Sequence, residues 1–386
     1  MKHAPTLKLL VGSWHLLRQI MAFGNPTAGG YTTMAEALWA VAQLNKRLMA
    51  EHGIEIAVSG HWWHELRVPD DAPEVGYSAQ WNNPRGISLD QWMDGALCGH
   101  YPLIGRIVPP GFGLPGSDDG AFINPDPIRR KLASDMLIYS FKWSDRVKMA
   151  GSEGDVIFWT GPDGIRWKRL VQGHDVLLGH DFNPQLEEWS LIVNGVGNAV
   201  KMARERGFTN TKLKIEGKPA GDPCYLDVFT DTSLEIECVR QINKVAGAMV
   251  AEWQGEFCHS RGGGQKFAAA MQQAIDAGVF GGAIHLNSGG LGTVSFTELL
   301  SKPGGTPASE FQQYVDNDFL PGEGVAEWVK DQLDTIKLGA KWSAQTGHPF
   351  AVEFDARFCR YADTIGALEK SARWTIATFS EAFAHL

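Results

Sequence analysis

The stretch Lys212-Leu-Lys-Ile-Glu-Gly-Lys-Pro219 contains a short run with two aliphatic residues, Leu213 and Ile215, that is closed by glycine and proline. Such a run predicts a β-strand over Leu213–Glu216, with Glu216 at its carboxyl end. Longer amphipathic stretches flank it, Pro184–Arg206 before and Thr232–Ala246 after, and both predict helices. A strand between two helices is the repeating unit of a parallel β/α sheet.

The same alternation recurs along the rest of the chain. The predicted strands are Lys8–Ser13, Ile54–Ser59, Ile104–Val108, Val156–Trp159, Leu213–Glu216, Met249–Glu252, Gly282–Leu286 and Phe350–Phe354. The predicted helices are Thr33–His52, Pro127–Lys148, Pro184–Arg206, Thr232–Ala246, Gly264–Ala277, Gly322–Thr346 and Thr364–Phe383. Because eight strands are the number that closes a barrel, the sequence predicts an α/β fold, a single-domain (β/α)8 TIM barrel over residues 1–386. Residues Pro69–His100 lack clear periodicity and predict an extended loop region.

The composition excludes several classes of protein. The chain has 386 residues, of which 44% are hydrophobic and 20% charged, as in soluble globular proteins. A net charge of −9 without a basic stripe argues against nucleic acid as a partner. Five scattered cysteines argue against a disulfide framework. No signal peptide and no apolar run of about 18 residues stand out, so we expect a cytoplasmic protein without a membrane partner.

Acidic residues and histidines gather at and after the later predicted strands, where barrel enzymes carry their active sites. They are Glu216, Glu256, His259, His285, Asp316, Asp318 and Asp355. Each alone is commonly a surface, turn or core residue, but together they fall in order at one rim. Crowded carboxylates repel one another unless a cation neutralises them. Oxygen ligands with some imidazole suit Mg²⁺, Mn²⁺ or Co²⁺, so we expect a metal centre there.

Several motifs, in order over residues 7–386, resemble those of the xylose isomerases. They are Asp119-Gly-Ala-Phe-Ile-Asn-Pro-Asp126 with Arg129-Arg130, Phe158-Trp-Thr-Gly-Pro-Asp-Gly164, Ile215-Glu-Gly-Lys-Pro219, Gly255-Glu-Phe-Cys-His259, Ile284-His-Leu-Asn287, Tyr314-Val-Asp-Asn-Asp318 and Phe354-Asp-Ala-Arg357. The resemblance implies a TIM barrel and an aldose–ketose isomerase that uses two divalent metal ions, Mg²⁺, Mn²⁺ or Co²⁺, in a hydride shift.

The resemblance also implies the ligands of both ions. The first ion would be held by Glu216, Glu256, His285 and Asp355, and the second by Glu256, His259, Asp316 and Asp318. Glu256 would then bridge the two. His285 stands where the xylose isomerases have aspartate, whereas the related rhamnose isomerases have histidine at this position.

Two further residues match catalytic positions of that family. Lys218 would polarise the carbonyl oxygen of the open-chain sugar, because a cation there stabilises the alkoxide that develops as hydride moves. His61 would open the sugar ring. The family places an aspartate three residues after that histidine, and this chain has His64 there instead, so the partner that orients His61 stays open.

Aromatic residues at the same rim would contact the sugar. Trp14, Phe112 and Trp159 match aromatic residues that flank the substrate in the family, and aromatic faces suit the C–H faces of sugars. Phe23 lies in a segment that resembles the loop entering a neighbouring subunit's site, which implies a homo-oligomer, a dimer or larger.

Three functions therefore compete. The first is a metal-dependent aldose–ketose isomerase, which the pair Asp316 and Asp318 favours because it supplies ligands for a second ion. The second is a ketose epimerase, or another metal-dependent enolising enzyme on a modified sugar, with a single ion. The third is a sugar-binding barrel without catalysis, which predicts a lost ligand set.

Overall fold

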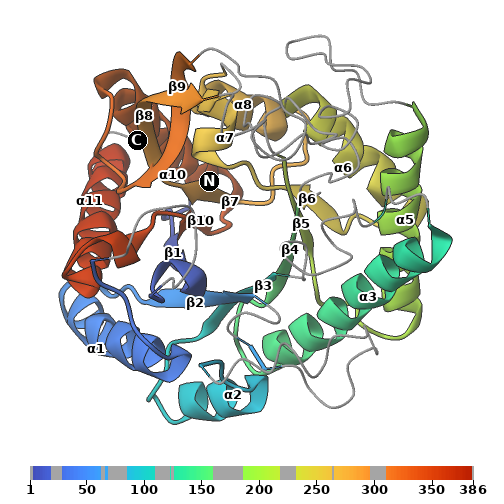
Figure 1. Cartoon of the computed structure of the whole chain (residues 1–386), viewed down its shortest axis with the longest axis horizontal. Coiled ribbons are helices and arrows are strands. Elements are labelled where there is room, and N and C mark those ends of the chain that lie inside the picture. The colour runs from blue at the N-terminus through green and yellow to red at the C-terminus, as the bar shows by residue number, and fades with distance from the viewer. Residues whose placement is uncertain are drawn as a thin grey trace.

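Eight parallel strands form one sheet that curls into a barrel (Figure 1). The computed structural model describes residues 3–18, 28–61, 66–67, 85–108, 122, 126–159, 186–217, 232–262, 265–295 and 310–384. The strands are β1 (Leu7–Gly12), β2 (Ile56–His61), β3 (Ile104–Val108), β4 (Asp155–Trp159), β5 (Leu213–Glu216), β6 (Ala251–Trp253), β7 (Ala283–Leu286) and β10 (Phe350–Phe354). Their order in the sheet is β6-β5-β4-β3-β2-β1-β10-β7. The predicted barrel of eight parallel strands is confirmed.

The two ends of this sheet, β6 and β7, meet through isolated parallel bridges rather than a continuous ladder. Trp253 pairs with Phe280, and Glu256 pairs with His285. The backbone N–H of His285 donates a hydrogen bond to the carbonyl oxygen of Gly255 at 3.0 Å. The seam that closes the barrel therefore runs through residues of the predicted metal centre.

Helices surround the sheet and cover its outer face (Figure 1). They are α1 (Met34–His52), α2 (Leu89–Leu97), α3 (Pro127–Met149), α5 (Leu186–Glu205), α6 (Thr232–Ala246), α7 (Phe257–Gly262), α8 (Phe267–Asp276), α10 (Ala326–Thr346) and α11 (Thr364–Ala384). Outward strand residues such as Val58 and Ile215 join the helices in the main hydrophobic core. Each such buried aliphatic side chain contributes about 1.5–3 kcal/mol. Across the helices that the structure describes, none combines the length and the apolar character needed to span a bilayer.

Buried asparagines attach two of these helices to the strands that follow them. Asn45 of α1 exchanges two hydrogen bonds of 2.9 Å with the backbone of Ile56. Asn243 of α6 accepts hydrogen bonds from the N–H groups of Val250 and Ala251 and donates one to the carbonyl oxygen of Ala251, each at 2.8 Å. Because these backbone groups lie at the start of a strand, the asparagines satisfy polar groups that the sheet leaves buried.

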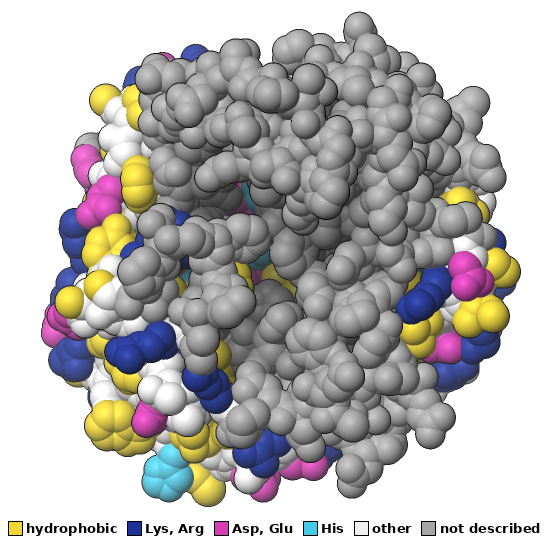
Figure 2. All heavy atoms as spheres, in the orientation of Figure 1, with side chains coloured by type: hydrophobic (Ala, Val, Ile, Leu, Met, Phe, Trp, Pro, Cys, Tyr) yellow, Lys and Arg dark blue, Asp and Glu magenta, His cyan; other side chains and the backbone are white. Residues whose placement is uncertain are grey.

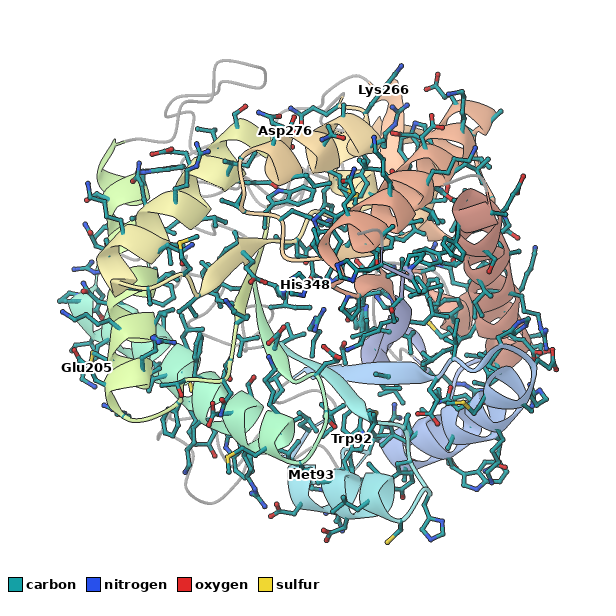
Figure 3. The ribbon with its side chains drawn as sticks, turned by 180° about the vertical axis from the view of Figure 1, so that it is seen from behind. Trp92, Met93, Glu205, Lys266, Asp276 and His348 are labelled. Atoms are coloured by element: carbon teal, nitrogen blue, oxygen red, sulfur yellow. The ribbon has the colours of Figure 1, made fainter. Side chains whose placement is uncertain are left out.

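The prediction of an extended loop over Pro69–His100 is wrong at its C-terminal end, where α2 forms. Ser88 and Gln91 make a reciprocal capping box at the start of this helix. Trp92 is fully buried, and its indole N–H donates to the carbonyl oxygen of Pro102 at 2.9 Å (Figure 3). The helix is short, so one buried tryptophan and a cap fix it where hydrophobic periodicity gives little signal.

A second sheet follows β7. The strands β8 (Ser288–Ser295) and β9 (Glu310–Phe319) form an antiparallel pair. Asp316 and Asp318 both lie on β9, a strand that the sequence does not predict. The partner strand begins Ser288-Gly-Gly-Leu-Gly292, and glycine has low strand propensity, so the pairing that orders β9 is not visible in the sequence.

Candidate active site

Charged and polar side chains lie inside the barrel, because residues of a strand alternate between its two faces. A small apolar cluster of Leu10, Ala283 and Ala351 is separate from the main core. Viewed along the barrel in Figure 2, histidine and acidic side chains are visible near the centre of the face. Figure 3 views the opposite end, where the turn that carries His348 leads from α10 into β10.

Glu216, the last residue of β5, contacts two histidines with its two carboxylate oxygens. Oε2 lies 3.0 Å from Nδ1 of His285 on β7, and Oε1 lies 3.3 Å from Nδ1 of His259 on α7. All three side chains are buried. The end of β5, the end of β7 and the first turn of α7 thus bring three of the predicted ligands together.

Glu256 joins the same group from the segment between β6 and α7. Its Oε2 lies 3.1 Å from Nδ1 of His259, and its carboxylate also accepts a hydrogen bond from the backbone N–H of His259. Nδ1 of His259 is 3.1 Å from the carbonyl oxygen of Gly217 as well. Glu256 directly precedes α7 and His259 lies in its first turn, so the spacing Glu-x-x-His brings the two side chains together.

Asp355 follows β10 and contacts a histidine that sequence reasoning missed. Nε2 of the buried His15 reaches the carboxylate of Asp355. Burial raises the pKa of Asp355, but the charges of His15, His285 and His259 outweigh it and hold the pKa below its usual value. Asp355 therefore lies within electrostatic reach of the Glu216 group.

The electrostatics of His285 are those of a buried cation between carboxylates. Burial lowers the pKa of His285, but Glu216 and Glu353 outweigh it and raise the pKa well above its usual value. Burial likewise raises the pKa of Glu216, and His285 and His259 reverse that effect, so the pKa ends well below normal. The carboxylate is therefore ionised at neutral pH and attracts positive charge.

The other predicted residues are placed less completely. Asp316 and Asp318 lie on β9, which packs against α7, the helix that carries His259. Trp14 lies in a 3₁₀ turn after β1, where the guanidinium carbon of Arg357 is 5.8 Å from its ring centroid. His61 and Trp159 are the last residues of β2 and β4. The predictions for Phe23, His64, Phe112 and Lys218 lie outside the described residues.

A divalent ion fits this donor set in chemistry and in pairwise spacing. Three carboxylate–imidazole pairs, Glu216–His285, Glu216–His259 and Glu256–His259, are 3.0–3.3 Å apart. Neighbouring ligands about 2.1 Å from one ion are separated by about 3.0 Å. Carboxylates with imidazoles suit Mg²⁺, Mn²⁺ or Co²⁺. Within the described ranges the match is limited to pairs of side chains, and no three His, Cys, Asp or Glu side chains are arranged to hold one ion.

Gln254 is a buried polar residue next to Glu216. In the register of β5 and β6, Ile215 pairs with Trp253, so Gln254 comes next to Glu216 on the same face of the sheet. The side chain is fully buried, and neither its oxygen nor its nitrogen has a hydrogen-bond partner among the residues that the structure describes. Such a buried amide is expected to bind water or a ligand.

No protein-family model matches the chain, and no curated protein sequence matches it. Solved structures share its fold at low identity. L-ribulose 3-epimerase is 10% identical over 97% of this chain and 95% of that one, with a TM-score of 0.54. D-allulose 3-epimerase from Methylomonas sp., in complex with D-allulose, is 11% identical over 97% and 98%, with a TM-score of 0.52.

A third similar structure is a xylose isomerase-like TIM barrel protein from Mycobacterium smegmatis in complex with magnesium. It is 10% identical over 99% of this chain and 98% of that one, with a TM-score of 0.50. The chain therefore has the fold of the xylose isomerase-like TIM barrels, as the sequence motifs predict. Identities this low establish the fold, and the chemistry has to be argued from the site.

Proposed function

We propose that the protein is a divalent-metal-dependent enzyme that isomerises or epimerises a small sugar. The observation that carries this proposal is the position of Glu216, whose two oxygens contact His285 and His259 at the carboxyl ends of the strands. Buried, ionised carboxylates next to imidazoles are the donors that a divalent ion requires. The D-allulose bound in one similar structure and the magnesium bound in another support the same class of function.

In this proposal the residues of the rim have separate roles. Glu216, Glu256, His285 and Asp355 hold the first ion, and Glu256, His259, Asp316 and Asp318 hold the second. A bound divalent ion supplies positive charge to the carbonyl and hydroxyl oxygens of the sugar. Lys218 donates a hydrogen bond to the carbonyl oxygen, and His61 moves the proton that opens the ring. Trp14, Phe112 and Trp159 cover the apolar face of the sugar.

Two reactions suit such a site, and the fate of one hydrogen separates them. Aldose–ketose isomerisation by hydride shift keeps the substrate hydrogen within the product, and the sequence motifs favour it. Epimerisation of a ketose removes a proton from carbon and returns one, so solvent hydrogen enters the product. The two similar structures that are 3-epimerases favour this second reaction.

The test is a panel of aldoses and ketoses incubated in D₂O with Mg²⁺, Mn²⁺ or Co²⁺. A new sugar without carbon-bound deuterium indicates the isomerase, and a C3 epimer with deuterium at C3 indicates the epimerase. Glu256→Gln should abolish turnover because it removes a charge from the ion site, whereas Glu237→Gln, on the exposed face of α6, should match the wild type. Turnover that persists in excess chelator contradicts the proposal.

We further propose that the chain forms one domain and assembles into a homo-oligomer, with the segment around Phe23 at the subunit contact. Light scattering on the purified protein measures the mass of the assembly against the 42.3 kDa of one chain. A monomer at all concentrations would contradict the assembly without touching the proposed chemistry.

A further inference from the structure

We propose that Glu353 and Arg106, inside the barrel, are positioning residues that hold the imidazole of His285 with Nδ1 towards the ion site. This inference rests on the proposed function, because it concerns a ligand of the proposed ion. Neither residue belongs to the motifs that predict the site. Both lie in strands whose other residues are apolar or glycine, Phe350-Ala-Val-Glu-Phe354 and Ile104-Gly-Arg-Ile-Val108.

His285 has a carboxylate at each ring nitrogen. Glu353 is its direct neighbour in the register of β10 and β7, and Oε2 of Glu353 lies 3.3 Å from Nε2 of His285. On the other side of the ring, Nδ1 lies 3.0 Å from Oε2 of Glu216. Both contacts are ion pairs between the imidazole and a buried carboxylate. Two carboxylates on opposite sides of the imidazole therefore fix the direction of the ring.

Glu353 and Asp355 lie at different depths in the barrel and contact different histidines. Glu353 precedes Asp355 by two residues on β10, so both face the barrel interior and Glu353 lies about 6–7 Å deeper along the strand. Asp355 contacts His15 at the rim, whereas Glu353 contacts His285 from below. In proteins, an imidazole that binds a metal through one nitrogen usually has its other N–H held by a carboxylate or carbonyl. Glu353 occupies that place for His285.

Arg106 compensates the buried charge of Glu353. Its Nε lies 3.9 Å from Oε2 of Glu353, and its Nη1 lies 3.6 Å from Oδ2 of Asp155. Only 3% of the Arg106 side chain and 5% of the Glu353 side chain are exposed. A carboxylate buried to this degree requires a nearby cation to stay ionised. Arg106 therefore places a buried positive charge beside the carboxylate that contacts Nε2 of His285.

A β-bulge turns Arg106 into the barrel. Ile104 and Ile107 both belong to the outer core, although strict alternation would put residues three apart on opposite faces. The pairing of β2 with β3 shifts register between Val58 and Gly60, which inserts the extra residue that this arrangement needs. Bulges of this kind re-aim a side chain and are frequent next to active sites. The bulge in β3 therefore directs the Arg106 side chain into the barrel, where it contacts Glu353.

The experiment measures Co²⁺ binding to the purified full chain by calorimetry and records the visible absorption of the bound ion. Glu353→Gln should weaken affinity about 10-fold and Glu353→Met up to about 100-fold, the range known for partners of metal-binding histidines. Both should alter the Co²⁺ absorption band. Glu252→Gln is the matched control, because Glu252 is also on the inner face of a strand but pairs with Lys214 away from His285.

The outcomes separate this inference from the proposed function. A wild-type protein that binds no divalent ion contradicts the proposed function. A wild type that binds Co²⁺, with both Glu353 variants matching its affinity and spectrum, overturns only the positioning role. Should the variants fail to fold, ¹⁵N-histidine NMR of the Mg²⁺-loaded wild type decides. The inference expects His285 to carry its proton on Nε2, and a proton on Nδ1 instead would overturn it.

Discussion

Nε2 of His15 contacts the carboxylate of Asp355 across the neighbouring strands β1 and β10. The aspartate was predicted as a metal ligand, and the histidine was not. His15 is buried after the first strand of the barrel, and Asp355 follows the last strand. Contact with His15, near the other end of the sequence, therefore holds the Asp355 side chain at the rim.

Replacing His15 by asparagine should weaken binding of Mn²⁺ about 10- to 100-fold, because Asp355 loses the partner that orients its carboxylate. Titration calorimetry on the purified protein checks the affinity. His52→Asn, at the exposed end of α1, is the control and should bind Mn²⁺ like the wild type. Equal affinities in the two variants would show that Asp355 needs no support from His15.

Glu216→Gln should lower the amount of divalent ion that co-purifies with the protein to near background. The change removes the charge that contacts both His285 and His259, and it leaves the shape of the side chain nearly the same. Elemental analysis after dialysis measures the bound metal. The exposed Glu237→Gln serves as the control. A normal metal content in Glu216→Gln would remove this residue from the ion site.

Acid should destabilise the fold partly through Asp155 at the base of the barrel. Burial raises the pKa of Asp155, but Lys214, Arg106 and Lys148 outweigh it, so the pKa in the folded protein lies below the unfolded value. A group with a lowered pKa stabilises the fold above its unfolded pKa, about 3.9, and loses that contribution as pH falls below it.

Asp155→Asn should therefore lose about 3–5 kcal/mol of unfolding free energy at pH 7, because it strands buried cations. Its stability should also fall less than that of the wild type between pH 5 and pH 3, a window about the unfolded pKa. Urea unfolding at both pH values gives the comparison, with the exposed Asp276→Asn as reference. Parallel losses in wild type and Asp155→Asn would refute the role of this carboxylate.

Asn243→Ala should destabilise the protein by about 3 kcal/mol, because it leaves backbone groups at the start of β6 buried without partners. Urea unfolding at neutral pH measures the change. Asn194→Ala, on the exposed side of α5, should change stability by no more than about 0.5 kcal/mol. A similar result for both asparagines would mean that solvent replaces the lost hydrogen bonds.

The sequence predicted the strands and most helices because their periodicity is a direct consequence of facing a core. It singled out Glu216, Glu256, His259, His285 and Asp355, which the structure brings together, because polar residues after strands stand out against apolar runs. Their role as metal ligands stays a prediction. The sequence did not predict β9, whose partner strand is rich in glycine, or α2, which depends on one buried tryptophan. Those elements are ordered by contacts that a local pattern does not contain.

Arg106, Glu353 and His15 were missed for a different reason. Each adjoins or interrupts an apolar run, and their importance follows from which residues face the barrel interior. The bulge between β2 and β3 decides the direction of Arg106, and the closure of the barrel brings Glu353 beside His285. A single sequence does not reveal either event, although an isolated charge within an apolar strand is a signal worth following.

The charged interior of the barrel has a consequence for how this sequence can diverge. Asp155 contacts Arg106, Lys148 and Lys214, and Arg106 in turn contacts Glu353. Loss of any one leaves its partners uncompensated, whereas replacing a whole ionic group with apolar residues is often neutral. Homologues with a hydrophobic barrel centre should therefore differ at positions 106, 155 and 214 together. Substitutions at these three positions should be correlated with one another rather than independent.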